Sequence, residues 1–108
     1  MIVEVRTYRL KPGTRDEFVR VMREDSLPLL AAAGIQVAGC GASLVDEDGA
    51  EDAYLIRTFD SLAQRDEQET AFYTSDAWRT GPREAIVSRI ESMHTIVLDP
   101  TTTPLMPR

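Results

Sequence analysis

The chain has 108 residues, of which 43% are hydrophobic and 28% are charged, and its 18 acidic and 12 basic side chains give a net charge of −6. This size and composition are typical of one soluble globular domain. The acidic excess argues against nucleic acid or an anionic membrane as the main partner, because both select basic surfaces. The single cysteine, Cys40, excludes an intramolecular disulfide and a zinc cluster. Because a single cysteine fits a reducing compartment better than secretion, and no apolar run nears the ~20 residues that span a bilayer, we expect a cytoplasmic protein.

The first ten residues predict a β-strand on which both faces mix polar and apolar side chains. With a period of two, one face carries Val3, Val5, Thr7 and Arg9, and the other carries Ile2, Glu4, Arg6, Tyr8 and Leu10. An ordinary half-buried strand has one apolar and one solvated face. The face that carries Glu4, Arg6 and Tyr8 therefore either meets water or lines an enclosed cleft.

The segment after this strand predicts a helix in two pieces. Thr14 and Glu17 have the spacing of a capping box at its start. Pro28 predicts a bend or break just before it, because proline cannot donate the helical hydrogen bond. Ser26 is then available to cap a short second piece that ends at Gly34.

The next segment predicts a β-hairpin. Residues 35–45 are β-like, and their glycines indicate a bulge or a close backbone approach. Asp48-Gly49 is typical of a tight hairpin turn, and the partner strand follows at residues 53–59.

The last part of the chain predicts a broken helical region and a final strand. Ser61 and Gln64 form a second capping box, which opens a helix to about residue 72 or 73. Residues 75–78 suggest a short helical turn, and Gly81-Pro82 restarts a helix that extends through residues 85–90. A strand is expected at residues 92–98.

The element order β-α-β-β-α-β predicts an α+β, ferredoxin-like domain over residues 1–99, with a four-stranded antiparallel sheet and both helical regions on one face. We expect residues 100–108 to form a tail that is flexible or latched on a neighbouring subunit. Because one helical layer leaves the other face of the sheet uncovered, we expect a homodimer in which two sheets face each other. Glu4, Arg6 and Tyr8 would then line a cleft between these sheets.

The opening of the chain strongly resembles the NIPSNAP family, whose first strand reads like I-x-E-x-R-x-Y-x-L and is followed by K-P-G. The matching residues are Ile2, Glu4, Arg6, Tyr8, Leu10, Lys11, Pro12 and Gly13. The likeness continues in Leu27-Pro28-Leu29-Leu30 with Gly34, in Phe59-Asp60-Ser61-Leu62-Ala63-Gln64-Arg65, and in Trp78. The resemblance implies a dimeric α+β barrel, a superfamily that includes cofactor-free monooxygenases, lactone isomerases, haem-binding enzymes and members without known catalysis. Fold therefore does not give function.

The sequence departs from the family in the third strand. That strand commonly reads H-L-W-x-Y in the family, whereas this chain has Leu55 in place of the histidine and Arg57 in place of the tryptophan. Any role of that histidine is therefore lost here, while Arg57 could bind an anionic group.

Five residues are candidates for ligand binding: Glu4, Arg6, Tyr8, Arg57 and His94. In the functional interpretation Arg6 holds a carboxylate or carbonyl, Glu4 acts as a base or orienting acceptor, and Tyr8 supplies a hydroxyl. In the alternative, Glu4 and Arg6 are a charge pair that fixes the dimer register. His94 is either a structural or rim residue, or a general base or haem ligand.

The sequence has no metal cluster, phosphate-binding glycine loop or nucleophile elbow, so we expect no cofactor or metal and assign no catalytic residue. The favoured hypothesis is a homodimer, or a higher oligomer, whose cleft binds a small organic molecule. A cofactor-free monooxygenase or isomerase, and a non-catalytic protein-interaction module, remain as alternatives. The sequence does not distinguish an enzyme from a binding protein.

Overall fold

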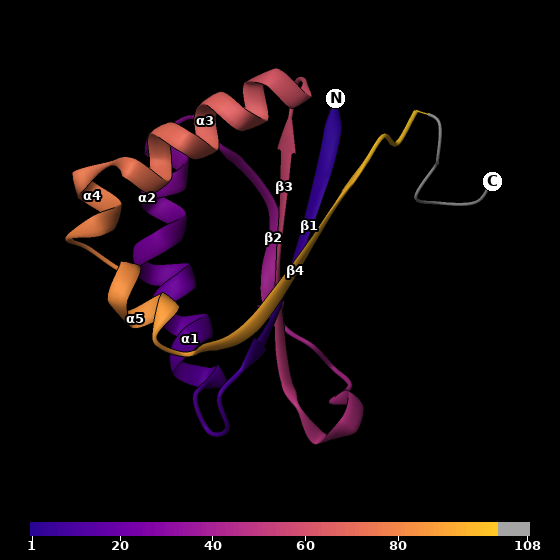
Figure 1. Ribbon diagram of the computed structural model, residues 1–108, viewed down its shortest axis with the longest axis vertical. Helices are drawn as coiled ribbons and strands as arrows, with labels where there is room; N and C mark the ends of the chain where they lie inside the picture. The colour runs from indigo at the N-terminus through magenta and orange to yellow at the C-terminus, as the bar shows by residue number, and fades with distance from the viewer. Residues whose placement is uncertain (102–108) are drawn as a thin grey trace.

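The computed structural model describes residues 1–101, which form a four-stranded antiparallel sheet with the α-helices of this region on one face (Figure 1). The strands are β1 (Ile2–Leu10), β2 (Gln36–Ala42), β3 (Glu51–Phe59) and β4 (Ile90–Leu98). The helices are α1 (Arg15–Val21), α2 (Leu27–Ala32), α3 (Leu62–Thr74), α4 (Asp76–Arg79) and α5 (Arg83–Val87). The strand order is β2-β3-β1-β4. The predicted ferredoxin-like fold is therefore confirmed.

Glu4, Arg6 and Tyr8 share one face of β1, as predicted, but that face looks toward the helices. The Tyr8 ring packs on Phe18 of α1 with 5.0 Å between ring centroids, and Arg6 bonds to Tyr73 of α3. The prediction that these side chains lie between the sheets of two subunits is therefore wrong. A period of two shows which residues share a face, and on a strand with two mixed faces it does not show which one the helices cover.

The predicted capping box at the start of α1 does not form. The Thr14 hydroxyl donates to the carbonyl oxygen of Lys11 at 2.6 Å and makes no cap to the helix. Glu17 pairs instead with Arg20, one turn along the helix. The Thr14 hydroxyl bonds to the turn before the helix instead of to the helix itself, because Ser and Thr side chains bond readily to nearby backbone groups.

The helix does not break before Pro28. It runs from α1 through a π-helical turn, Met22–Ser26, directly into α2. The Leu27 N–H donates to the Met22 carbonyl, five residues back, which is the π pattern. Pro28 lies in the first turn of α2, where a missing N–H is tolerated. Ser26 makes no cap, so that prediction is also wrong, while Gly34 ends the helical segment with φ +79° as expected.

The hairpin of β2 and β3 is present with a longer connection than a two-residue turn. A short 3₁₀ turn, Glu47–Gly49, carries the predicted pair, and both Asp48 and Gly49 have positive φ. The register shifts between Val37 and Gly39, which confirms the bulge. β2 ends at Ala42, earlier than residue 45.

The capping prediction holds in part for the second helical region, because the Ser61 cap forms while the Gln64 side chain accepts from the Asp60 N–H. The Gln64 N–H donates to the Ser61 hydroxyl at 3.1 Å at the start of α3, and Ser75 caps α4 in the same way. α5 ends at Val87 and β4 begins at Ile90, two residues before the predicted start, because Ile90 pairs with Leu10 across a bulge at Glu91 of β4.

The core lies between the sheet and the helices. Its buried members are Tyr8, Leu10, Phe18, Val21, Met22, Leu30, Ile35, Ala53, Leu55, Phe59, Phe72, Trp78 and Ile86. None of the helices within residues 1–101 has the length and hydropathy needed to cross a membrane. The predicted tail lies outside the described residues from position 102 onward.

Candidate functional site

A buried ion cluster joins the centre of the sheet to α3. Glu4 of β1 and Arg57 of β3 are register partners, and both are fully buried. Glu4 Oε1 accepts hydrogen bonds from Arg57 Nε at 2.9 Å and from Arg57 Nη2, and Glu4 Oε2 accepts one from Arg65 Nε at 2.6 Å. The predicted partner, Arg6, is farther away, with Nη2 3.9 Å from Glu4 Oε1. Arg57 therefore donates to Glu4 here, and its binding of an external anion stays a prediction.

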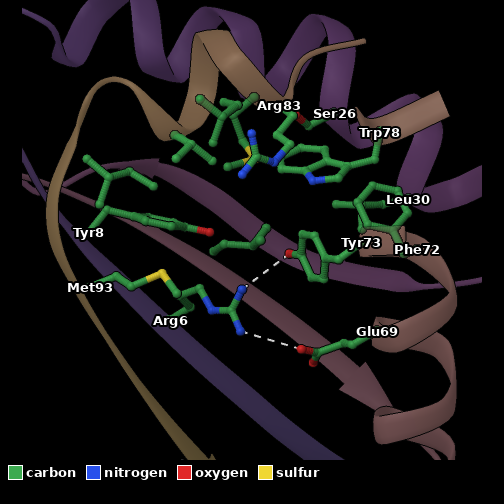
Figure 2. A pocket seen from close by; sticks show the side chains of 15 residues that line it. Arg6, Tyr8, Ser26, Leu30, Glu69, Phe72, Tyr73, Trp78, Arg83 and Met93 are labelled. Atoms are coloured by element: carbon green, nitrogen blue, oxygen red, sulfur yellow. Dashed lines mark hydrogen bonds and ion pairs between the residues drawn. The ribbon is translucent and has the colours of Figure 1, made fainter. Parts of the chain in front are cut away.

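Arg6 extends from the cluster toward open space. Its Nε donates to Thr95 Oγ1 at 3.0 Å, which fixes the guanidinium over the sheet. Nη1 lies 3.2 Å from the Tyr73 hydroxyl and Nη2 lies 3.4 Å from Glu69 Oε1, as the dashed lines in Figure 2 show. Arg6 therefore links β1 and β4 to α3.

The Tyr73 hydroxyl oxygen accepts two hydrogen bonds, one from Arg6 and one from Arg57 Nη1 at 2.8 Å. A phenolic oxygen has two lone pairs and one hydrogen, so both acceptor positions are used. The O–H hydrogen is left to donate to an acceptor other than these two arginines.

Two carboxyl groups share this cluster, and their pKa values shift in opposite directions. The burial of Glu4 is outweighed by hydrogen bonding to Glu69 and by the charge of Arg57, so the pKa of Glu4 is lowered. Burial and the neighbouring Glu4 raise the pKa of Glu69 to about 7. Glu69 Oε2 lies 3.1 Å from Arg65 Nε and 3.5 Å from Arg57 Nη2 but accepts no hydrogen bond from them, whereas both oxygens of Glu4 accept hydrogen bonds. Glu69 is therefore the carboxyl group that exchanges protons near neutral pH.

A pocket of about 370 Å³ opens beside this cluster, between the sheet and the helices of one chain (Figure 2). Its polar lining comes from Arg6, Tyr8, Ser26, Glu69, Tyr73 and Arg83. The rest of the lining is apolar: Met22, Leu30, Leu55, Phe72, Trp78, Ile86, Val87, Ile90 and Met93. Burial and the nearby Tyr73 raise the pKa of Tyr8 to about 12, which keeps its phenol protonated.

The structure brings four of the five sequence candidates together. Arg6 and Tyr8 line the pocket, and Glu4 and Arg57 form the buried support behind Arg6. His94 does not join them: it pairs with Thr7 on the opposite, open face of the sheet and is exposed.

Three residues of α3 were missed by sequence reasoning. Arg65, Glu69 and Tyr73 are spaced by four residues, which places them on one face of a helix. The sequence signal that could have identified them is a stripe of polar side chains at helical spacing on α3, a helix that must pack on the sheet. Within residues 1–101, no group of three or more His, Cys, Asp or Glu side chains is placed to hold a metal ion.

Comparison with protein families identifies the chain. The NIPSNAP family model matches residues 3–104. The chain belongs to the NIPSNAP family. Solved relatives agree: a NIPSNAP domain protein from Burkholderia xenovorans is 21% identical, with 100% of each chain covered and a TM-score of 0.82. A NIPSNAP family protein of unknown function from Agrobacterium tumefaciens is 24% identical, with 98% of this chain and 94% of that chain covered and a TM-score of 0.83.

The NIPSNAP fold also extends to more distant proteins. A putative antibiotic biosynthesis monooxygenase from Nitrosomonas europaea is 13% identical, covers 92% of this chain and 97% of its own, and has a TM-score of 0.66. This likeness concerns the fold alone. The search of curated proteins gave no match.

Proposed function

We propose that this NIPSNAP protein binds a small, mainly apolar organic molecule in the pocket between its sheet and its helices. The observation that carries the proposal is the cavity of about 370 Å³ in which apolar walls meet a few convergent polar groups. Ligand sites typically have this volume range and this mixture of surfaces. This open cavity favours a ligand site over a protein-interaction module, because an interaction module does not need an empty interior.

The polar end of the pocket is built to hold an oxygen of the ligand. Tyr73 has a hydrogen to donate because its lone pairs are occupied by Arg6 and Arg57. Glu4 anchors Arg57 from behind, so the donors are held by a buried, hydrogen-bonded support. Such fixed groups give orientation and specificity, while the apolar walls give most of the affinity.

The test uses N-phenyl-1-naphthylamine, a neutral apolar fluorophore that brightens when it leaves water. We expect saturable binding to the native protein and loss of binding in Met93→Trp, which fills the pocket from a side chain that is 56% exposed. The matched control is Leu62→Trp, at an exposed position of α3 outside this lining, which should bind as the native protein does. Equal binding by both variants would contradict a ligand site in this pocket.

A second candidate function is acid–base catalysis of the isomerase type, and Glu69 favours it. Its carboxylate can take a proton from a carbon beside a carbonyl, while the electron pair moves onto the carbonyl oxygen. That oxygen would accept hydrogen bonds from Tyr73 and Arg6, and return of the proton from Glu69 to carbon completes the cycle without a co-reactant. A general base works best when its pKa lies near the working pH, as the raised pKa of Glu69 does.

Deuterium exchange tests this candidate. In D₂O the native protein should accelerate exchange of the α-protons of 4-hydroxyphenylacetone, followed by NMR, with a rate that rises with pH through about 7 as Glu69 ionises. Glu69→Gln should abolish the acceleration. Glu67→Gln, an exposed residue of the same helix, should retain it. Equal rates in the two variants would exclude Glu69 as the base.

A further inference from the structure

Two polar groups of the pocket have no role in the arrangement described so far. Ser26, from the π-helical turn, and Arg83, the first residue of α5, both line the same cavity. In Figure 2 they lie on the side of the pocket next to Trp78, across the cavity from Arg6 and Glu69. The pocket thus has a second polar end.

The Ser26 hydroxyl is buried without a hydrogen-bond partner. Ser26 is 2% exposed, and its Oγ has no partner within residues 1–101. A helical serine often donates to the carbonyl four residues back, but the π-helical turn directs the Met22 carbonyl to the Leu27 N–H instead. A buried hydroxyl without a partner destabilises the folded state, so an oxygen placed in the cavity beside it would be bound favourably.

Arg83 is a cation without a carboxylate partner. No ion pair or hydrogen bond of its side chain occurs within the described part of the chain, whereas Arg6 has three partners across the pocket. Arg83 is exposed and stands at the rim of an apolar cavity. Because a guanidinium stays charged at any working pH, this position favours an anionic group on the ligand.

We propose that the ligand is an amphipathic carboxylic acid. Its carboxylate is bound by Arg83 and by the Ser26 hydroxyl, its apolar body packs on the walls around Trp78, and a hydroxyl or carbonyl at its far end reaches Tyr73. One guanidinium and one hydroxyl suit a monoanion better than a phosphate dianion, which needs more donors. This inference rests on the proposed ligand site and adds the chemical class of the ligand.

The test compares matched competitors that displace bound N-phenyl-1-naphthylamine. The probes are 3-(4-hydroxyphenyl)propionate, its amide, which lacks the charge, and 3-phenylpropionate, which lacks the hydroxyl. We expect the full acid to bind about tenfold more tightly than the amide and a few fold more tightly than 3-phenylpropionate. Arg83→Gln should remove the preference for the acid over the amide. The control Arg79→Gln removes the same charge from an exposed arginine outside the lining and should keep that preference.

Ser26→Ala gives a second, independent readout. If Ser26 serves the ligand, the variant without ligand should melt at the native temperature or higher, because a buried unpartnered hydroxyl is removed, while affinity for the acid falls about fivefold. A purely structural Ser26 would instead lower the melting temperature and leave the affinity unchanged, which would overturn its assignment. If the fluorophore binds but the acid and the amide displace it equally, the carboxylate proposal is overturned and the ligand site stands. If the fluorophore does not bind at all, the ligand site itself fails.

Discussion

At the scale of single residues, the site depends on buried charges that are complete only as a group. Glu4 and Arg57 are both fully buried, and Glu4 uses both oxygens to accept from Arg57 and Arg65. The free energy of such a cluster is a balance of desolvation and attraction, so removing one partner leaves a charge that neither water nor protein compensates. The cluster is therefore sensitive to single changes in a way that surface ion pairs are not.

Removal of Arg57 should destabilise the protein strongly. Arg57→Met should lower the free energy of unfolding by about 3–5 kcal/mol, because Glu4 keeps its burial and loses its main partner. Arg20 offers the matched control, since it pairs with Glu17 and Glu24 on the exposed side of α1. Arg20→Met should leave the free energy of unfolding close to the native value, because water screens exposed ion pairs. Urea unfolding of both variants measures the difference, and equal losses would mean that the Glu4 cluster is effectively solvated.

Glu69 should make stability depend on pH. Its pKa in the folded protein is raised from 4.5 to about 7, so the folded state binds more protons than the unfolded chain between these values. The contribution of Glu69 to the free energy of unfolding therefore falls as the pH rises from 4.5 to about 7. Thermal melts should show a steeper decline between pH 5 and 8, on the order of 1–3 kcal/mol, in the native protein than in Glu69→Gln. Parallel curves for the two proteins would contradict the assignment.

At the scale of elements, the irregular parts of the helical layer shape the pocket. The π-helical turn brings Ser26 to its wall, and the short helices α4 and α5 bring Trp78 and Arg83. Gly81 lies between α4 and α5, where an added Cβ would stand 2.3 Å from the carbonyl oxygen of Ala77. The close approach of the Gly81 backbone to the Ala77 carbonyl therefore requires glycine at this position. It also determines the direction in which the chain enters α5.

Gly81→Ala should therefore disturb the pocket as well as the fold. The contact is with backbone, which cannot rotate away, so we expect a loss of about 1–3 kcal/mol in the free energy of unfolding and weaker binding of N-phenyl-1-naphthylamine. Gly39→Ala is the control, because its nearest neighbour would be a Tyr54 side-chain carbon at 3.7 Å, an ordinary contact. Chemical denaturation of the two variants provides the measurement. A Gly81→Ala protein as stable as the control would show that α5 shifts freely.

At the scale of the whole molecule, the sheet has one covered face and one open face (Figure 1). On the open face, Val5 pairs with Ile56 on one side and with Ile96 on the other, which makes an apolar row across three strands. Ile96 is 46% exposed. An antiparallel sheet whose outer face meets water is ordinarily polar there, so this row favours the proposed homodimer, with a second copy of the chain as the cover.

The dimer proposal predicts a solution mass near twice the 12.1 kDa of one chain in sedimentation measurements at micromolar concentration. Ile96→Lys should yield a monomer, because a charge would be buried in the centre of the interface. Leu62→Lys, at an exposed position of α3, should leave the assembly intact. A native monomer at that concentration, or a dimer that tolerates Ile96→Lys, would contradict this interface.

The local predictions that the structure confirms are those in which both hydrogen-bonding groups lie within a few residues of each other in the sequence. Ser61 and Gln64 are three residues apart, and the Gln64 N–H donates to the Ser61 hydroxyl as expected, because both groups lie within one helical turn. Thr14 and Glu17 have the same spacing, yet Lys11 and Arg20 provide better partners and the cap is absent. Pro28 marks a real irregularity, but packing keeps the segment helical by widening a turn.

The sequence by itself determined the order of elements, the ferredoxin-like sheet and the fact that Glu4, Arg6 and Tyr8 share one face, since these follow from periodicity and local chemistry. Only the tertiary structure decided that this face meets the helices, that Arg57 and not Arg6 is the main partner of Glu4, and that residues of α3 complete the site. The physical reason is distance along the chain. Glu4 and Arg57 are 53 residues apart and Arg6 and Glu69 are 63 apart, so their contacts depend on strand register and helix packing, which no local pattern encodes.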